Sequence, residues 1–170
     1  MEEKAGRSGT KMSIEAVKKA LEGYGLAGRV KEFEVSSATV ELAAQAVGVQ
    51  PGRIAKSLTF LDGERCIMVV TAGDQKIDNK KYKGQFGCKA KMLTPEQALH
   101  FTGHAVGGVC PFALPEDGRT SVYLDVSMQR FETIFPAAGT ASSAVELTCD
   151  ELAQASGSQG WVDVCKPMEG

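Results

Sequence analysis

The clearest pattern in the chain is a pair of strand-like runs on either side of a turn. Residues 56–61 and 65–71 flank the dipeptide Asp62-Gly63. A dipeptide of this type between two runs rich in β-branched and apolar residues predicts a β-hairpin, because its glycine accepts the positive φ that a tight turn requires. We therefore expect two adjacent antiparallel strands here.

Helices are indicated where apolar residues recur at helical spacing behind a capping residue. One such run follows Ser13, and a second covers residues 40–47 behind Thr39. The capping boxes Thr94–Gln97 and Thr148–Glu151 begin two more. Further strand-like runs cover residues 30–35, 122–126, 133–136, 144–147 and 161–165. Since most connections are too short for repeated βαβ crossovers, the pattern predicts a single α+β domain with a mixed, largely antiparallel sheet.

Composition supports one globular domain. The chain has 170 residues, of which 43% are hydrophobic and 24% charged, which excludes disordered, collagen-like and coiled-coil proteins. The net charge of −2 means that any nucleic-acid contact must come from a local basic patch. No apolar run has the length of a membrane helix. Residues 1–12 are polar and lack the apolar segment of a signal peptide, so we expect a flexible lead or a cloning remnant, a folded domain over residues 13–170, and a cytoplasmic location.

The cysteines and histidines do not indicate a metal site. The five cysteines are widely spaced and form no CxxC pair, so we expect reduced thiols. His100 and His104 stand four residues apart between Cys88 and Cys110, which is half of a zinc-finger spacing without the other half. We therefore expect no cofactor, and a zinc-dependent hydrolase or regulator stays open as an alternative. Cys110 also raises a nucleophile hypothesis, with His104 as its base.

Three further features allow both a structural and a chemical interpretation. Six lysines fall between residues 76 and 91 with only Asp78 opposing them, which is typical of a solvated face or of a phosphate-binding patch. Lys56 begins an apolar strand, where it either protects a sheet edge or points into a cleft. The glycine-rich segment Gly107–Pro111 is either an ordinary turn or a cradle of backbone N–H groups for an oxyanion. Asp125 is either a buried partner for a lysine or a strand-end cap.

The order of the short motifs is more specific than any one of them. From the N-terminus they are SATVELAA at 37–44, GV at 48–49, RIAKSL at 53–58, VTAGD at 70–74, GGVCPF at 107–112, YLD at 123–125 and PAAG at 136–139. This order resembles the YbaK family, the free-standing relatives of the editing domain that is inserted in bacterial prolyl-tRNA synthetase. The resemblance covers about residues 13–164.

The resemblance implies a compact α+β fold with a barrel-like sheet surrounded by short helices, and hydrolysis of the ester that joins a wrong amino acid to tRNA. The family's essential lysine follows an Ile/Val-Ala pair, which matches Lys56. Its G-x-x-x-P loop falls on Gly107–Pro111, where Gly107 and Gly108 would place N–H groups near the scissile carbonyl. Its small-residue loop matches Ala138-Gly139. The substrate-binding residues expected on this basis are Ser37, Thr39, Ser57, Cys110, Pro111, Asp125, Ala138 and Gly139.

The expected function is therefore trans-editing: a deacylase clears a small amino acid such as Cys, Ala, Ser or Thr from tRNA(Pro) or a related tRNA. Since only the acceptor end must be bound, the acidic net charge is no objection. Lys76, Lys80, Lys81 and Lys83 are the expected tRNA contacts. We expect a monomer, with an aminoacyl-tRNA synthetase as a further partner. A binding module of the same fold without turnover is the alternative.

Overall fold

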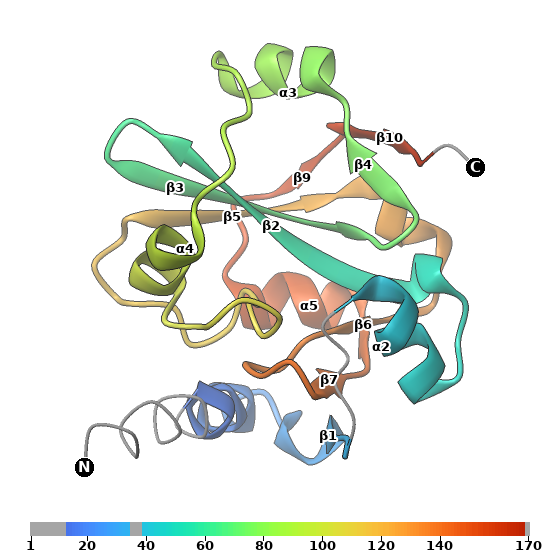
Figure 1. Ribbon diagram of the computed structural model, residues 1–170. Coiled ribbons are helices and arrows are strands. Elements are labelled where there is room, and N and C mark those ends of the chain that lie inside the picture. Colours follow the sequence, from blue (N-terminus) through green and yellow to red (C-terminus); the bar gives the residue numbers. More distant parts are fainter. Residues whose placement is uncertain (1–12, 35–38, 169–170) are drawn as a thin grey trace.

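The computed structural model describes residues 13–34 and 39–168 (Figure 1). Its centre is a six-stranded sheet in the order β8-β6-β2-β3-β5-β9. The strands are β2 Ile54–Asp62, β3 Arg65–Ala72, β5 Thr120–Asp125, β6 Thr133–Pro136, β8 Leu147–Thr148 and β9 Trp161–Val162. Two small sheets add β1 Val30–Glu32 with β7 Ser143–Val145, and β4 Gln75–Ile77 with β10 Cys165–Pro167. The curled sheet confirms the expected α+β class.

The predicted hairpin forms the middle of the sheet. Strands β2 and β3 pair in antiparallel register from Ala55–Ala72 to Asp62–Arg65, and Gly63 turns the chain with a φ of 61°. Strands β6 and β8 are also antiparallel, whereas β6 lies parallel to β2, β5 parallel to β3 and β9 parallel to β5. The sheet is therefore mixed, with pairings of both kinds.

Short helices surround this sheet. They are a helix over residues 13–22, then α2 Val40–Val47, α3 Asn79–Phe86, α4 Pro95–Thr102 and α5 Cys149–Ser156. Three 3-10 helices cover Ala27–Arg29, Pro51–Arg53 and Val126–Arg130. Both expected capping boxes form, and Thr39 caps α2 by accepting a hydrogen bond from the backbone N–H of Leu42 at 3.1 Å. Helices α2 and α4 lie over opposite ends of β2, and α3 lies at the far end of the molecule from β1 (Figure 1).

Three apolar clusters pack on the sheet in the described part of the chain, and the two largest hold it between its helices. The larger joins the helix over residues 13–22 and α5 to β3 and β5 through fully buried side chains such as Val17, Met68, Leu124 and Leu152. The smaller one, around Phe60 and Val69, is covered by α3. No helix among the described residues is long and apolar enough to cross a membrane. Residues 1–12 lie outside the described ranges, so the expected domain boundaries stay a prediction.

Candidate active site

One cavity brings together several of the residues singled out by the sequence. It has a volume of about 260 Å³ and lies between the start of α2, strand β2, the segment that leads into α4, and residues 106–109. Residues of β6 and β7 close its remaining side. Lys56, Ser57, Thr39 and Gly107 all contribute to its lining.

Lys56 occupies a half-buried position in β2. Its Nζ lies 3.8 Å from the thioether sulfur of Met168, in the C-terminal strand region. Burial is the strongest influence on the amine and lowers its pKa from the ordinary value. The acidic groups of Cys165, Asp74 and Glu41 oppose this by raising the pKa. Lys56 is thus a cation in a partly desolvated position, where its charge interacts more strongly with a ligand than it would in water.

Ser57 supplies an unpartnered polar atom. Its hydroxyl oxygen is buried and has no hydrogen-bond partner among the described residues. A buried hydroxyl without a partner costs free energy, about 1–3 kcal/mol. Because this residue lines the cavity, a polar group of a ligand can satisfy it. The hydroxyl of Thr39, in contrast, is engaged in the cap of α2.

The glycine-rich loop presents backbone donors at the cavity. Gly107 has a φ of 93°, in the region that favours glycine. Both Gly107 and Val109 line the cavity, and their N–H groups have no partner among the residues that the structure describes. Gly108 differs from the expectation: its N–H donates to the carbonyl of Ala105 at 2.9 Å and closes a local turn. The N–H groups that remain available are therefore those of Gly107 and Val109.

Gly108 instead fixes the position of the loop by close packing. A Cβ on this residue would lie 2.4 Å from the carbonyl oxygen of Gly139. Gly139, with a φ of 100°, is itself packed against the backbone of Ser13, where an added Cβ would be 2.9 Å from the carbonyl oxygen. The two small-residue loops predicted from the sequence are thus in contact. Ser143 holds the second of them, since its hydroxyl accepts from the N–H of Ala138 at 3.2 Å.

Other predicted site residues lie outside the cavity lining. Cys110 is completely buried, and burial raises the pKa of its thiol to about 12, which is the reverse of what a thiolate nucleophile needs. Asp125 is a strand-end cap: its carboxylate accepts from the N–H groups of Ser127 and Val164. Pro111, Ala138 and Gly139 are buried and do not line the cavity. Ser37 lies outside the described residues.

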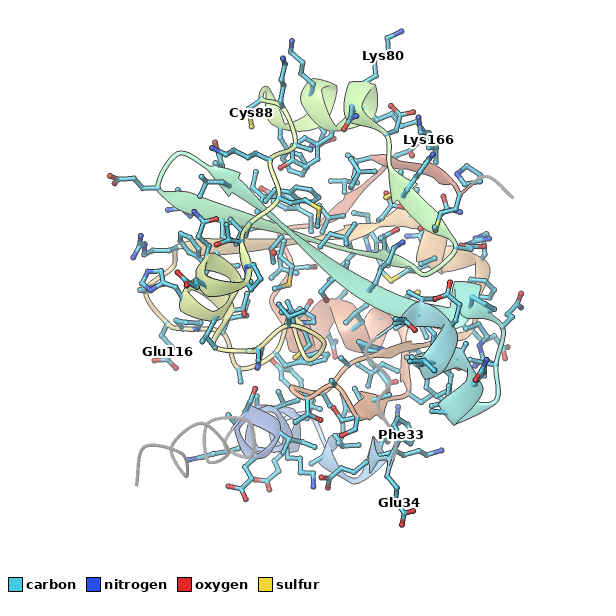
Figure 2. All side chains as sticks on the ribbon, viewed as in Figure 1. Phe33, Glu34, Lys80, Cys88, Glu116 and Lys166 are labelled. Carbon is cyan, nitrogen blue, oxygen red and sulfur yellow. The ribbon has the colours of Figure 1, made fainter. Side chains whose placement is uncertain are left out.

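The expected tRNA-binding lysines lie on β4 and α3, away from the cavity lining. Lys76, Lys80 and Lys83 are exposed. Lys81 is engaged, since its ammonium donates to Asp163 and to the carbonyl of Cys165, both at 3.1 Å. Lys166 joins this surface, which the sequence did not indicate, because it stands directly opposite Lys76 in the β4–β10 pair. Lys80 and Lys166 project from the same end of the molecule (Figure 2).

The two histidines have separate environments. His100 is exposed and contacts the Arg119 guanidinium, whereas His104 is buried within hydrogen-bond distance of Ser13 and Phe112. Across residues 13–34 and 39–168, no group of three or more His, Cys, Asp or Glu side chains is arranged to hold a metal ion. The structure therefore offers nothing that favours the zinc-dependent alternative.

Several cavity residues could not be found from sequence patterns. Thr59, Thr94 and Ser143 add polar groups, and Met92 and Val106 stand 64% exposed at its rim. The capping box identified Thr94 as the N-cap of a helix, but it did not indicate that Thr94 lines a cavity. The others carry no local signal, since long-range strand pairing and loop packing bring them together.

Comparison with known families agrees with this geometry. Residues 34–155 match the aminoacyl-tRNA editing domain family. The chain is 52% identical over 159 residues to uncharacterized protein YwhH of Bacillus subtilis (strain 168), which spans 93% of this chain and 100% of that protein. It is also 32% identical over 77 residues to the proline–tRNA ligase of Thermotoga sp. (strain RQ2). That match covers 45% of this chain but only 13% of the ligase.

A solved structure shows the same fold. The chain superposes with a TM-score of 0.81 and 31% identity on the crystal structure of "a putative trans-editing enzyme for prolyl tRNA synthetase". The superposition covers 91% of this chain and 97% of that one.

Proposed function

Because the chain belongs to the aminoacyl-tRNA editing domain family, we propose that it is a deacylase that hydrolyses the ester of mischarged tRNA. The observation that carries the proposal is one cavity that is lined by Lys56, by Ser57 with its unpartnered hydroxyl, and by Gly107 and Val109, whose N–H groups have no partner among the described residues. The substrate is a small amino acid such as Cys, Ala, Ser or Thr on tRNA(Pro) or a related tRNA. The cavity volume of about 260 Å³ suits a small aminoacyl group with part of a ribose.

The reaction needs no strong nucleophile, because an aminoacyl ester is already activated. Water adds to the carbonyl carbon, and the carbonyl oxygen takes on negative charge in the tetrahedral intermediate. The N–H groups of Gly107 and Val109 stabilise that oxyanion, and the Lys56 ammonium adds a positive charge nearby. The bond between the carbonyl carbon and the ribose oxygen then breaks, and the ribose oxygen takes up a proton that balances the one lost by the attacking water. The products are the free amino acid and uncharged tRNA.

Ser57 completes the substrate contacts in this proposal. Its buried hydroxyl is positioned to bond a polar group of the aminoacyl-ribose unit, which would compensate the desolvation of that hydroxyl. Thr39 borders the same cavity, and its hydroxyl oxygen accepts the capping hydrogen bond of α2. We also propose that the protein acts in the cytoplasm as a monomer and associates with an aminoacyl-tRNA synthetase.

The test is a deacylation panel. Purified protein is incubated with Ala-, Cys-, Ser- and Thr-esters of tRNA(Pro) and of their own tRNAs, and release of the amino acid is followed against the uncatalysed rate. We expect turnover of at least one ester, and the panel then identifies the amino acid and the tRNA. Saturable tRNA binding without turnover of any ester would contradict the deacylase proposal and favour a binding module of the same fold.

The basic surface of β4 and α3 gives a second prediction. Lys76 and Lys166 face each other across an antiparallel pair, an arrangement of like charges that is unfavourable unless anions are nearby. Replacing Lys76, Lys80 and Lys83 together by Gln should weaken tRNA binding about tenfold at moderate salt and make its salt dependence shallower, because fewer counterions are released. Filter binding at several salt concentrations measures both quantities.

Lysines at the other end of the molecule provide the control. Lys19 and Lys31 are exposed on the helix over residues 13–22 and on β1, remote from α3 (Figure 1). Their replacement by Gln removes two positive charges, against three in the test variant. A loss of binding free energy in this control that is two thirds as large or more would show that only net charge matters, and would refute a localised acceptor-stem contact.

A further inference from the structure

We propose that His104 is a positioning residue of this site: its ring ties the two ends of the glycine-rich loop together and anchors the loop to the helix that carries Ser13. This inference rests on the proposed deacylase function. It adds a residue that neither the motifs of the sequence nor the cavity lining identify, since His104 does not border the cavity. The sequence suggested only a metal ligand or a base for Cys110 at this position.

The ring closes the loop from both sides. His104 is 1% exposed, and its Nε2 lies 2.7 Å from the carbonyl oxygen of Phe112. That contact joins a residue three positions before the loop to the residue directly after it. Its Nδ1 is hydrogen-bonded to the hydroxyl of Ser13, which belongs to a separate helix. A single side chain thus connects the helix over residues 13–22, the segment before the loop and the segment after it.

The partners determine the tautomer of the ring. A carbonyl oxygen only accepts hydrogen bonds, so the Nε2 facing Phe112 carries the hydrogen and donates. In a neutral ring Nδ1 is then an acceptor, and the Ser13 hydroxyl donates to it. Burial lowers the pKa of the ring, which keeps it neutral near physiological pH. The titratable neighbour is Cys110, whose Sγ lies 3.5 Å from Nε2 and whose thiol stays protonated because burial raises its pKa to about 12.

The same segments determine where the loop N–H groups lie. Ser13 contacts His104 through its side chain and Gly139 through its backbone. Gly139 in turn packs on Gly108, which lies between the two free donors of Gly107 and Val109. The loop is therefore held at its ends by His104 and in its middle by Gly139. Loss of the His104 contacts releases the restraint at the ends of the loop.

The chain after the loop is also in an unusual conformation. Ala113, the residue after Phe112, has a φ of 54°, which non-glycine residues rarely adopt. Such a conformation persists where surrounding contacts impose it. The hydrogen bond from His104 holds the carbonyl of the peptide group that joins Phe112 to Ala113, and the Cys110 thiol lies 4.0 Å from the same oxygen.

Two substitutions separate the two contacts of the ring. The amide of Gln reaches about as far as Nε2 and can still donate to Phe112, whereas the amide of Asn reaches about as far as Nδ1 and can retain only Ser13. Since displacing reacting groups by about 1 Å costs on the order of 100-fold in rate, we expect His104→Asn to lower kcat at least tenfold with KM within about twofold of wild type. We expect His104→Gln to retain kcat within about threefold. His100→Gln, on the exposed histidine, should match wild type.

A second measurement does not depend on activity. In ¹H–¹⁵N spectra, the amide signals of Gly107 and Val109 should move or broaden in His104→Asn and stay near their wild-type positions in His104→Gln, while thermal unfolding confirms that each variant is folded. Equal kcat values in the two variants and wild type, or unmoved loop amides in His104→Asn, would overturn the proposal. If His104→Asn does not fold, His104→Met takes its place, because its side chain has a similar length but no N–H to donate to Phe112. Wild-type kcat and loop signals in His104→Met would overturn the proposal equally.

The experiment distinguishes the failure of this inference from the failure of the proposed function. Wild type without turnover of any ester, but with loop amides that respond to His104→Asn, would refute the deacylase proposal and leave the positioning role intact. If wild type hydrolyses an ester and both His104 variants match its kcat, the positioning role is refuted and the deacylase proposal stands.

Discussion

Lys56→Ala should lower the deacylation rate by about 100- to 1000-fold, the range observed when one oxyanion-stabilising group is removed from an enzyme. The amine is the one cationic group that the cavity lining contains among the described residues, and partial burial strengthens its interaction with developing negative charge. The loss should appear in kcat more than in KM, because the charge that Lys56 stabilises is absent from the ground-state ester. Single-turnover release of the amino acid from a charged tRNA measures it.

The fold should tolerate this substitution. The hydrogen bond of the amine is a weak one to the Met168 sulfur, so we expect the free energy of unfolding to change by about 1 kcal/mol or less. Lys19→Ala, an exposed lysine on the helix over residues 13–22, is the matched control and should retain full activity. Wild-type turnover in Lys56→Ala would remove this residue from the mechanism. Loss of tRNA affinity with unchanged turnover of bound substrate would instead make Lys56 a binding residue.

The pH dependence of kcat shows whether the charged or the neutral form of Lys56 acts in catalysis. Burial lowers the pKa of Lys56, so its ammonium loses its proton at a lower pH than an exposed lysine does. If the ammonium stabilises the oxyanion, then kcat, corrected for uncatalysed hydrolysis, declines on the alkaline side below the ordinary lysine pKa of about 10.4. In Lys56→Ala this decline should disappear. A catalysed rate that rises through the same range in wild type would mean that the neutral amine acts, as a general base.

Local signals account for the parts of the fold that the sequence predicted. The hairpin over residues 54–72 and both capping-box helices depend on a turn or on contacts within four residues, and all three form as expected. Helix α3 was missed because lysines fill it, and Tyr82 is the residue that it buries. The expected single strands over 144–147 and 161–165 each divide in two, since neighbouring residues pair with different sheets. The parallel placement of β5 beside β3 has no local signal at all.

For the candidate site, too, some residues could be predicted from the sequence and others could not. Lys56 and Gly107 could be identified because a family motif carries them, and both line the cavity. The motif could not show that the N–H of Gly108 is used within the loop, which leaves Val109 as the second donor. Nor could it show that Cys110 and Asp125 are buried by long-range packing. Residue types near a motif indicate the chemistry, but tertiary contacts decide which atoms reach the substrate.

Gly108→Ala is the second substitution for which we expect a large effect. Its added Cβ would meet backbone atoms only: the carbonyl oxygen and carbon of Gly139 at 2.4 and 2.5 Å and the nitrogen of Thr140 at 2.6 Å. No flexible side chain can move aside, and Gly139 cannot retreat because it is packed on Ser13. The two loops must therefore separate. Overpacking of this kind costs about 1–3 kcal/mol of stability, which urea unfolding measures.

Separation of the loops should also reduce catalysis, since it displaces the N–H groups of Gly107 and Val109 from the position of the oxyanion. We expect kcat to fall at least tenfold, beyond any loss that the fraction of folded protein explains. Gly28→Ala is the matched control: this exposed glycine has ordinary φ and no atom within 4 Å of an added Cβ, so stability and activity should stay at wild-type levels. A Gly108→Ala protein with wild-type stability and kcat would show that the two loops are not held as closely as 2.4 Å implies. It would also mean that Gly139 does not fix the position of the catalytic loop.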